Sequence, residues 1–405
     1  MPPSIFISAG EASGEQYGAL LATELFHRFA PKGGTTELGM GGPRMAAAGV
    51  QLIVRAENMA VMGLTEVVLH LPRIYREFRK LKRAIRTHPP TVAILIDFPE
   101  INFRLAREFH RLGVPVIYFV SPQLWAWKQH RIRLVREYVR RMLVIFPFEE
   151  PYYRARGVDA EFVGHPLADL PQPSITRQQF AAENHLDSAR TWIGLLPGSR
   201  MKEIQANLPE MIQAAILLGD KYEYILPLAP TLTKPQIETI QQQLGVGATS
   251  AEPPRITFVH DARAPLFHAR ASVVASGTAT VEAALIGNPF VVVYRVSPLT
   301  YAIARRMVKV PHVAMANLIA GKRVVPELIQ HDFTAANIVQ HLSLLLPDGP
   351  ARESMRMELG AVREALRGQA AHQQGQTAIE RVAAIVVQEV EPACPAPASA
   401  FSARP

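Results

Sequence analysis

Three glycine-containing turns carry most of the residues whose types and spacing favour ligand chemistry. The first, Gly10–Glu15, follows the apolar run Ile5–Ala9, and a helical pattern begins within it. Glycine lets the backbone approach a ligand closely, and free N–H groups at a helix start attract anions. Two carboxylates in the turn oppose a bare phosphate, so the hydroxyls of a sugar suit it at least as well. We predict sugar contacts, with an ordinary capped turn as the alternative, from Glu11, Ser13, Gly14 and Glu15.

The second turn, Pro197–Arg200, follows the apolar run Ile193–Leu196 and opens another helical pattern. No carboxylate lies within it, and Arg200 adds a permanent positive charge that can bind phosphate through two parallel hydrogen bonds. We therefore favour phosphate binding over a capped turn with a surface arginine. The predicted contacts are Pro197, Gly198, Ser199 and Arg200.

The third turn, Ser276–Thr280, follows the run Ser272–Ala275 and leads into a helix that carries Glu282. Serine and threonine can cap such a helix while N–H groups face a ligand. An ionised carboxylate only accepts hydrogen bonds, which suits the neighbouring hydroxyls of a ribose. We predict nucleotide contacts from Ser276, Gly277, Thr278 and Glu282, and a buried capping-box glutamate is the alternative.

Other nucleotide and metal fingerprints are absent from the sequence. There is no G-x-x-x-x-G-K-[ST] segment, and Gly39–Arg44 starts like G-x-G-x-x-G but has arginine at the third glycine. Gly10–Gly14 does not match G-x-S-x-G, and neither H-E-x-x-H nor C-x-x-C occurs. These observations disfavour a P-loop protein, a Rossmann dehydrogenase, a serine hydrolase and a zinc site.

The elements that must position these turns alternate between short β-branched runs and helical patterns, which is typical of parallel sheets with crossover helices. In the first half we expect strands at Ile5–Ala9, Leu38–Gly41, Leu52–Arg55, Val92–Asp97, Val116–Val120, Met142–Phe146 and Glu161–Val163. In the second half we expect strands at Ile193–Leu196, Tyr224–Leu228, Ile256–Val259, Ser272–Ala275 and Phe290–Arg295. The pattern predicts an α/β protein with two doubly wound sheets and a cleft between them.

The domain organisation follows from where the strands stop. We expect a first domain over residues 1–165, a linker rich in Pro, Gln, Asn and Asp over 166–190, and a second domain over 191–346. Residues 347–390 show helical spacing at Leu359, Val362, Leu366, Ile379, Val382 and Ile385. These helices pack back on the first domain or exchange with a partner in a homodimer. Residues 391–405, rich in Pro, Ala and Ser, are expected to be disordered.

Composition limits the classes of protein and of partner. The 405 residues are 48% hydrophobic and 19% charged, which is globular rather than disordered composition. The formal charge of +8 favours anionic partners. One cysteine, Cys394, fits a reducing, cytoplasmic compartment. We expect no signal peptide and no membrane span, so any membrane contact is peripheral.

Eight segments carry a resemblance that covers about Ile5–Ile385. They are Gly10–Gly14 (GEASG), Ala60–Gly63 (AVMG), Asp97–Phe103 (DFPEINF), Tyr118–Trp127 (YFVSPQLWAW), Phe162–Pro166 (FVGHP), Leu195–Arg200 (LLPGSR), Ala275–Glu282 (ASGTATVE) and Asn317–Gly321 (NLIAG). Together they resemble the lipid-A-disaccharide synthases, GT-B glycosyltransferases of Gram-negative bacteria. The block Val120–Trp127 is the one least expected in another family. The chain departs from the family at Glu15, where Asp is common, and at Glu100-Ile101, where Asp-Phe is common.

The resemblance implies a GT-B fold and an inverting glycosyl transfer that needs no metal or other cofactor. UDP-2,3-diacylglucosamine and 2,3-diacylglucosamine 1-phosphate (lipid X) would yield the β-1,6-linked lipid A disaccharide 1-phosphate and UDP. The first domain would hold the acceptor and its lipid chains, and the second would hold the UDP-sugar. The resemblance also implies that Glu282 contacts the ribose and that Asn317 contacts the pyrophosphate or the uracil.

Such a transfer needs a base for the acceptor's 6-hydroxyl and positive charge for the departing diphosphate. We predict that Asp97 is the base, because it ends the apolar run Val92–Ile96, at the edge where doubly wound sheets hold ligands. Arg200 and the N–H groups of its turn would stabilise the leaving UDP in place of a metal. Asp97 could instead orient the acceptor or cap a helix. The alternative bases are Glu11, Glu15 and His165.

Acylated substrates imply a lipid-facing surface on the first domain. We predict lipid contact from Val61, Met62, Leu64, Val67, Val68 and Leu71. Helical spacing continues through Tyr75–Ile85, where packing on the chain's own sheet is the favoured alternative. Pro72 could start a second helix at its first position and so divide the stripe in two. Basic residues are frequent over Arg73–Arg86 and Lys128–Arg141, as suits an anionic surface. We expect peripheral attachment to the cytosolic face of the inner membrane.

Two other functions are weighed against this interpretation. Another GT-B enzyme of UDP-sugars, such as a UDP-N-acetylglucosamine epimerase or a peptidoglycan glycosyltransferase, would share the architecture but not the blocks Asp97–Phe103 and Val120–Trp127. An RNA-binding protein would explain the positive charge. With 7% aromatic residues and no RNA-binding motif, we expect no nucleic acid partner.

Overall fold

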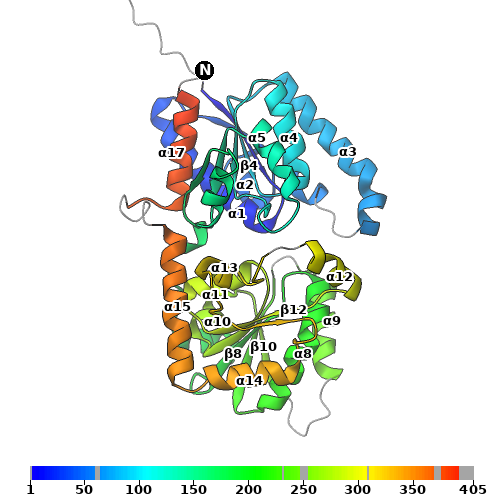
Figure 1. Cartoon of the computed structure of the whole chain (residues 1–405), viewed down its shortest axis with the longest axis vertical. Coiled ribbons are helices and arrows are strands. Elements are labelled where there is room, and N and C mark those ends of the chain that lie inside the picture. Colours follow the sequence, from blue (N-terminus) through cyan, green and yellow to red (C-terminus); the bar gives the residue numbers. More distant parts are fainter. Residues whose placement is uncertain are drawn as a thin grey trace, which may run out of the picture. The chain divides into compact units, whose positions relative to one another are not determined.

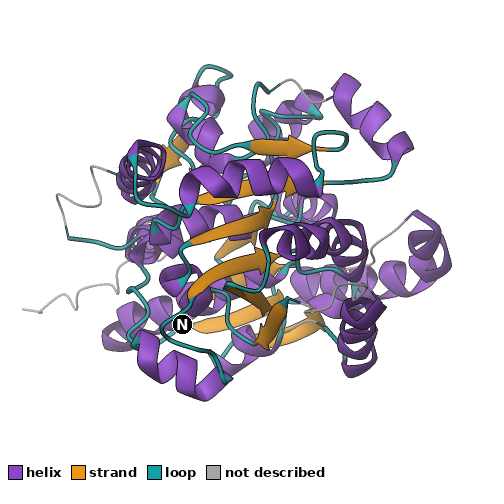
Figure 2. Ribbon diagram, turned by 90° about the horizontal axis from the view of Figure 1, so that it is seen from below, coloured by secondary structure: helices purple, strands orange, loops and turns teal. Residues whose placement is uncertain are grey.

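The computed structural model describes residues 2–59, 64–229, 232–246, 254–307, 310–368 and 375–391. The chain divides into two compact units, one of Met1–Asp169 with Leu366–Pro405 and one of Leu170–Ala365. Each unit contains a parallel sheet with helices packed around it (Figure 1 and Figure 2). This confirms the predicted α/β class with two doubly wound sheets.

The first unit is built on a seven-stranded parallel sheet in the order β3-β2-β1-β4-β5-β6-β7. Its strands are β1 (Ser4–Ala9), β2 (Thr36–Gly41), β3 (Gln51–Arg55), β4 (Val92–Ile96), β5 (Val116–Phe119), β6 (Arg141–Val144) and β7 (Ala160–Phe162). Its α-helices are α1 (Ala12–Phe29), α2 (Pro43–Ala47), α3 (Leu64–Thr87), α4 (Pro99–Arg111), α5 (Ile132–Tyr138), α6 (Glu149–Arg154) and α17 (Ala378–Val390). Short 3₁₀ helices are η1 (Ala30–Lys32), η2 (Ala56–Asn58), η3 (Gln129–Arg131) and η4 (Pro166–Asp169).

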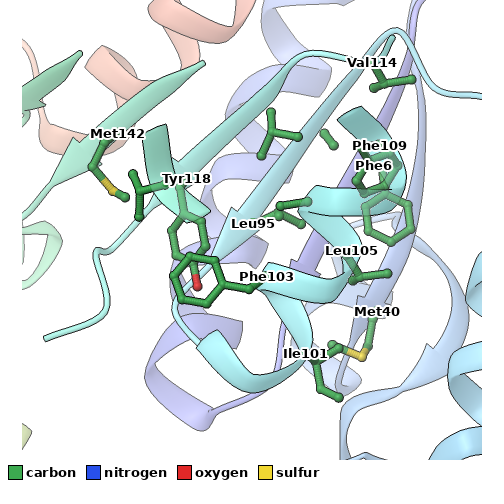
Figure 3. Close-up of a cluster of buried hydrophobic side chains, with 14 of the residues drawn as sticks. Phe6, Met40, Leu95, Ile101, Phe103, Leu105, Phe109, Val114, Tyr118 and Met142 are labelled. Carbon is green, nitrogen blue, oxygen red and sulfur yellow. The ribbon is translucent and has the colours of Figure 1, made fainter. Parts of the chain in front are cut away.

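A large hydrophobic cluster of this unit lies on the sheet face that α4 covers. Phe6, Leu95 and Tyr118, from three adjacent strands, meet Phe103 and Phe109 of α4 in one buried cluster (Figure 3). Side chains two residues apart share a face of a strand, so each strand sends alternate residues into this cluster. The helix α17, from the end of the chain, packs against α1 of the same unit.

The second unit is built on a six-stranded parallel sheet in the order β10-β9-β8-β11-β12-β13. Its strands are β8 (Thr191–Leu196), β9 (Tyr222–Pro227), β10 (Arg255–Val259), β11 (Ala271–Ala275), β12 (Phe290–Tyr294) and β13 (Glu327–Ile329). Its helices are α7 (Arg177–Asn184), α8 (Met201–Leu218), α9 (Lys234–Val246), α10 (Arg263–His268), α11 (Thr278–Ile286), α12 (Pro298–Met307), α13 (Met315–Ala320), α14 (Ala335–Leu345) and α15 (Pro350–Arg367).

The structure contains every strand that the sequence predicts and one that it does not. The additional strand, β13, pairs with β12 at the sheet edge over three residues, too few to show a periodic pattern. The predicted helix start at Pro72 is wrong, because α3 runs through that residue. Pro72 is exposed, and the helix continues through it with one backbone hydrogen bond fewer, because proline has no N–H. The segment 166–190, expected as a linker, contains η4 and α7.

Candidate active site

The strand order creates one topological switch point in each sheet. In the first, the chain moves from β1 outward through β2 and β3, then returns to the other side of β1 as β4. In the second, β8 and β11 are neighbours for the same reason. Doubly wound sheets bind ligands at the carboxyl ends of such strand pairs. Gly10–Glu15 and Asp97 follow β1 and β4, whereas Pro197–Arg200 and Ser276–Thr280 follow β8 and β11. The predicted turns therefore pair up at the two switch points.

Asp97 has an unusual backbone conformation at the end of β4. Asp97 and Phe98 have φ angles of 44° and 47°, in the left-handed region that residues other than glycine rarely adopt. The Asp97 carbonyl accepts hydrogen bonds from Asn102 Nδ2 at 2.7 Å and from the Tyr118 hydroxyl at 2.6 Å. The Asp97 N–H donates to the Phe119 carbonyl at 3.1 Å. Two left-handed residues in sequence are thus held by bonds from two neighbouring elements.

The ring of Phe98 lies so close to Gly10 that a side chain at this position would clash with it. A Cβ atom added to Gly10 would lie 2.7 Å from Phe98 Cδ2 and closer to two other atoms of that ring. The turn after β1 therefore packs directly on the turn after β4. The α4 helix begins at Pro99 with Phe98 at its N-cap position, so the alternative of Asp97 as the N-cap is not realised.

The surroundings of Asp97 suit a base that works near neutral pH. Burial, together with the negative charge of Glu11, raises the pKa of its carboxyl to about 7, although the Phe98 N–H partly opposes the rise. Desolvation and a like charge both penalise the ionised form. A general base is most effective when its pKa lies near the working pH. Half of the Asp97 carboxyls are therefore ionised at about pH 7.

The other residues predicted to contact the sugar or to act as bases differ in their burial and in their hydrogen bonds. Glu11 is exposed at the N-cap position of α1, Ser13 is half-buried, and Gly14 is buried against Ile96. The Glu15 carboxylate accepts the Arg44 N–H at 2.7 Å, at the start of α2. Glu15 thus stabilises a helix start within its own unit.

His165, the third alternative base, is packed inside the first unit. It is buried, its Nδ1 accepts the Leu167 N–H at 3.2 Å, and its ring contacts Tyr17 and Phe146. Burial lowers its pKa to about 3, so it is neutral at physiological pH. This arrangement is that of a packed loop histidine.

The block Val120–Trp127, which follows β5, is held in place by hydrogen bonds with residues of α6. Glu149 is buried and accepts hydrogen bonds from the Ser121 hydroxyl at 2.5 Å and the Trp125 indole N–H at 3.0 Å. The Tyr153 hydroxyl donates to the Pro122 carbonyl at 3.0 Å. Sequence reasoning identified the block but missed these partners. A glutamate followed by aromatic residues on a short helix gives no local signal of burial.

In the second unit, the turn before α8 is organised around Glu203. Gly198 has a φ of 125°, and Arg200 occupies the N-cap position of α8. The N–H groups of Ser199 and Arg200 donate to Glu203 Oε2 at 3.1 and 3.4 Å. The Arg200 guanidinium donates to Glu203 Oε1 at 3.3 Å. The groups predicted to bind phosphate thus surround a carboxylate of the chain itself.

The turn after β11 presents backbone groups rather than side-chain caps. Gly277, with a φ of 149°, occupies the N-cap position of α11, and this cap makes no side-chain hydrogen bond. Neither the predicted serine or threonine cap nor the alternative of Glu282 in a capping box is realised. Burial raises the pKa of Glu282, the positive charge of Arg263 lowers it, and the negative charge of Asp261 raises it.

Asn317 is held on all sides by its own unit. It is fully buried, and its Oδ1 accepts the N–H groups of Val324 and Val325 at 2.7 and 2.9 Å. Its Nδ2 donates to the Val325 carbonyl at 2.9 Å and to Glu327 at 2.8 Å. An amide has two donors and two acceptor positions, so this one is fully used. The amide fixes the segment that leads into β13.

The predicted lipid contacts lie at the start of α3 and before it. Val61 and Met62 lie outside the described residues, as do the side chains of Leu64, Val67 and Val68. Leu71 is 51% exposed and Tyr75 is 64% exposed, whereas Leu81 and Ile85 are buried in the core. The alternative of packing on the sheet is therefore confirmed for the end of this stretch but not for Tyr75.

Two further observations concern metals and membranes. Within the described residues, no group of three or more His, Cys, Asp or Glu side chains is arranged to hold a metal ion. Among those same residues, no helix is long and apolar enough to cross a membrane.

Comparisons with known proteins place the chain in a family. The model of the family described as lipid-A-disaccharide synthetase matches residues 5–382. A lipid-A-disaccharide synthase from Acidobacterium capsulatum is 63% identical over 370 residues, which cover 90% of this chain and 92% of that protein. The glycotransferase of kitacinnamycin shares the fold with a TM-score of 0.61 at 15% identity, over 96% of this chain and 99% of that one.

The GT-B fold by itself does not separate this family from its relatives. A UDP-GlcNAc 2-epimerase from Neisseria meningitidis also matches, with a TM-score of 0.60 at 12% identity, over 95% of this chain and 99% of the epimerase. At such identities the similarity establishes the fold alone. The family model and the identity over most of the chain decide between the alternatives. The protein is a glycosyltransferase, and the chain belongs to the lipid-A-disaccharide synthetase family.

Proposed function

We propose that the protein transfers a 2,3-diacylglucosaminyl group from UDP to the 6-hydroxyl of 2,3-diacylglucosamine 1-phosphate. The observation that carries the proposal is Asp97, a carboxylate with a pKa near 7, held in a left-handed turn at the switch point of the first sheet. Membership of the family supplies the substrates. The pKa near 7 supports Asp97 as the base that such a transfer requires.

Asp97 is the proposed base for the acceptor. Its carboxylate takes the proton of the 6-hydroxyl as that oxygen attacks the anomeric carbon of the donor. The bond from the anomeric carbon to the diphosphate oxygen breaks, UDP departs with the electron pair, and the configuration inverts. General-base assistance contributes about 10²–10⁴ in rate. Glu11, Ser13 and Gly14 are the proposed sugar contacts, with Glu15 holding the neighbouring helix.

The second unit is the proposed donor site. Gly198, Ser199 and Arg200 would face the diphosphate, with Pro197 shaping the turn, and Ser276, Gly277 and Thr278 would add N–H groups from the neighbouring strand end. Glu282 would accept hydrogen bonds from the ribose. Asn317, whose hydrogen bonds are all used within the unit, would position this site rather than contact the donor. Charge from Arg200 would stabilise the departing UDP, as electrostatic stabilisation does elsewhere.

The primary test is product analysis with purified protein, UDP-2,3-diacylglucosamine and lipid X. We expect one disaccharide 1-phosphate and one UDP per catalytic turnover, and we expect the same products in excess EDTA. Loss of turnover in EDTA that Mg²⁺ restores would contradict a metal-free mechanism. Release of UDP and a free sugar without lipid X, or conversion of UDP-N-acetylglucosamine, would favour another enzyme of UDP-sugars.

The Asp97→Asn variant tests the assignment of the base. Asparagine keeps the size of the side chain but cannot accept the proton at neutral pH. We expect turnover to fall by about 10²–10⁴, in line with the loss of a general base, while UDP binding by calorimetry stays unchanged. Near-normal turnover would remove Asp97 from the mechanism.

We also propose that the outer surface of α3 meets the membrane. Leu71, Tyr75, Arg76, Arg79 and Arg83 are exposed on this helix, and the Arg79 guanidinium lies 5.8 Å from the Tyr75 ring centroid. Each arginine contributes about 1 kcal/mol near an anionic surface, so three contribute about 3 kcal/mol, or a factor of about a hundred in binding.

Vesicle sedimentation tests this surface. We expect binding to vesicles rich in anionic lipid, release at high salt, and little binding to vesicles of phosphatidylcholine alone. Replacing the three arginines by glutamine should weaken the salt-sensitive part, whereas Leu71→Ser with Tyr75→Ser should weaken what remains at high salt. Unchanged binding in both variants would assign the membrane contact to another surface.

A further inference from the structure

Two side chains, those of Tyr118 and Asn102, donate to the carbonyl group of Asp97, and Ser8 bonds to the Asn102 amide. Ser8, Leu95 and Tyr118 lie in one row across β1, β4 and β5. Ser8 and Tyr118 therefore flank β4, the strand that Asp97 follows, and both are fully buried. The third participant, Asn102, lies one turn into α4 and is also fully buried. Figure 3 shows the Tyr118 ring beside Phe103, with which it packs.

The hydrogen bonds among these groups lead from Ser8 through the Asn102 amide to the Asp97 carbonyl, which Tyr118 also reaches. The Ser8 hydroxyl donates to Asn102 Oδ1 at 2.6 Å, which fixes which end of the amide points at β4. Asn102 Nδ2 then donates to the carbonyls of Ile96 at 3.1 Å and Asp97 at 2.7 Å. The Tyr118 hydroxyl donates to the same Asp97 carbonyl at 2.6 Å. Burial and the charge of Asp97 raise the pKa of Tyr118, so its phenol keeps the donating proton.

These hydrogen bonds offset the free-energy cost of the left-handed backbone conformation at Asp97 and Phe98. A residue other than glycine in the left-handed region costs on the order of 1–3 kcal/mol and persists only where its surroundings enforce it. Asp97 and Phe98 both carry this cost. Without a donor on the Asp97 carbonyl, the peptide would relax toward an ordinary conformation, and the carboxylate would move with it.

We propose that Tyr118, together with Asn102 oriented by Ser8, is a positioning device that holds Asp97 in its left-handed turn and so aims its carboxylate at the acceptor. These residues do not touch the substrate and act only through the backbone of Asp97. The inference rests on the proposed function, because it presumes that Asp97 is the base. It assigns a role in the reaction to a tyrosine that packing alone would explain as part of the core.

The Tyr118→Phe variant tests the device, because it removes one hydroxyl and leaves the ring in place. Tyr224→Phe is a matched control. Tyr224 is also fully buried, and its hydroxyl also donates to backbone carbonyls, those of Ala215 at 2.9 Å and Gly219 at 3.1 Å, but in the second unit. Ser8→Ala is the second test variant, because it frees the Asn102 amide without touching Asp97.

The expected results separate positioning from stability. Misplacing a catalytic group by about 1 Å costs on the order of a hundredfold. We expect Tyr118→Phe to lower kcat by about ten- to a hundredfold with KM nearly unchanged, and Ser8→Ala to lower kcat in the same way but less. The acidic limb of the pH profile should move to lower pH, because a released Asp97 is less buried. Tyr224→Phe should lose comparable thermal stability and keep the kinetics of the parent.

Other outcomes overturn the inference in distinguishable ways. If Asp97→Asn is inactive while Tyr118→Phe and Ser8→Ala keep the parental kcat and pH profile, Asp97 needs no such device. If both variants lose kcat no more than the Tyr224→Phe control does, the effect is one of stability. If Asp97→Asn itself retains normal turnover, both the proposed base and the proposed positioning device are refuted.

Discussion

Replacing Gly10 by alanine is the most direct test of how the two turns of the first sheet depend on each other. The backbone of Gly10 does not have a positive φ, so alanine is compatible with its conformation. Such a change would normally stabilise a protein slightly, by about 0.4–1 kcal/mol through the unfolded state. Any loss must therefore come from the methyl group itself.

The methyl group would meet the ring of Phe98. It would lie 2.7 Å from Phe98 Cδ2 and still closer to two other atoms of the ring, whereas ordinary van der Waals contact begins at 3.4 Å. The ring must retreat by about 1 Å, and because Phe98 follows Asp97 in the left-handed turn, the carboxylate moves with it. A displacement of this size costs on the order of a hundredfold in rate, and overpacking costs about 1–3 kcal/mol of stability.

The assay is steady-state turnover together with thermal melting. Gly14→Ala is the matched control for folding and melting only, because Gly14 is itself a proposed sugar contact. A Cβ at Gly14 would lie 3.5 Å from its nearest neighbour, an ordinary contact, and alanine is the better helix former. We expect Gly10→Ala to lose kcat about ten- to a hundredfold and Gly14→Ala to be folded and at least as stable. The reasoning is refuted if Gly10→Ala turns over normally.

Three further predictions concern carboxyl groups. With the pKa of Asp97 near 7, kcat/KM should rise about tenfold from pH 6 to pH 8, and a flat profile would contradict the assignment of Asp97 as the base. Glu11→Gln should shift this rise to lower pH, because it removes a like charge beside Asp97. Glu37 is buried with neither carboxyl oxygen hydrogen-bonded, and burial raises its pKa to about 8. Its ionised form is penalised only in the folded state, so the protein loses stability as pH rises from about 4.5 to about 8. At pH 8.5, Glu37→Gln should be more stable by at most about 5 kcal/mol in chemical denaturation, with the exposed Glu183→Gln as control. In the proposed donor turn, Glu203→Gln should tighten UDP binding in calorimetry, because a carboxylate next to the proposed diphosphate site is lost; weaker binding would mean that Glu203 is needed to shape the turn.

Much of the architecture is predictable from short-range patterns. Buried strands such as Val92–Ile96 are continuous apolar runs, and glycine-containing turns such as Gly10–Glu15 follow them directly, so element types and the order of the turns are visible in the chain. The two failures have local causes. β13 is too short to show a period, and Pro72 breaks the pattern of a helix that continues through it.

Partner assignments are less predictable, because they join residues far apart in the chain. Glu15 looks like a ligand-binding acid in its turn, yet its carboxylate accepts an N–H from α2. Asn317 lies in a family motif, yet its amide is fully used by the segment that leads into β13. Each of these outcomes depends on which backbone groups the fold brings within hydrogen-bonding distance.

The sequence by itself determined the family, the α/β class, and the identity of the residues that end the strands, because these depend on residue types and on spacing along the chain. Only the tertiary structure decided that Asp97 lies beside Gly10 at a switch point, because strand order is set by long-range pairing. It also decided the left-handed turn and the donors from Asn102 and Tyr118, which come from α4 and β5. Burial of that turn raises the pKa of Asp97 to about 7, a property that no local pattern contains.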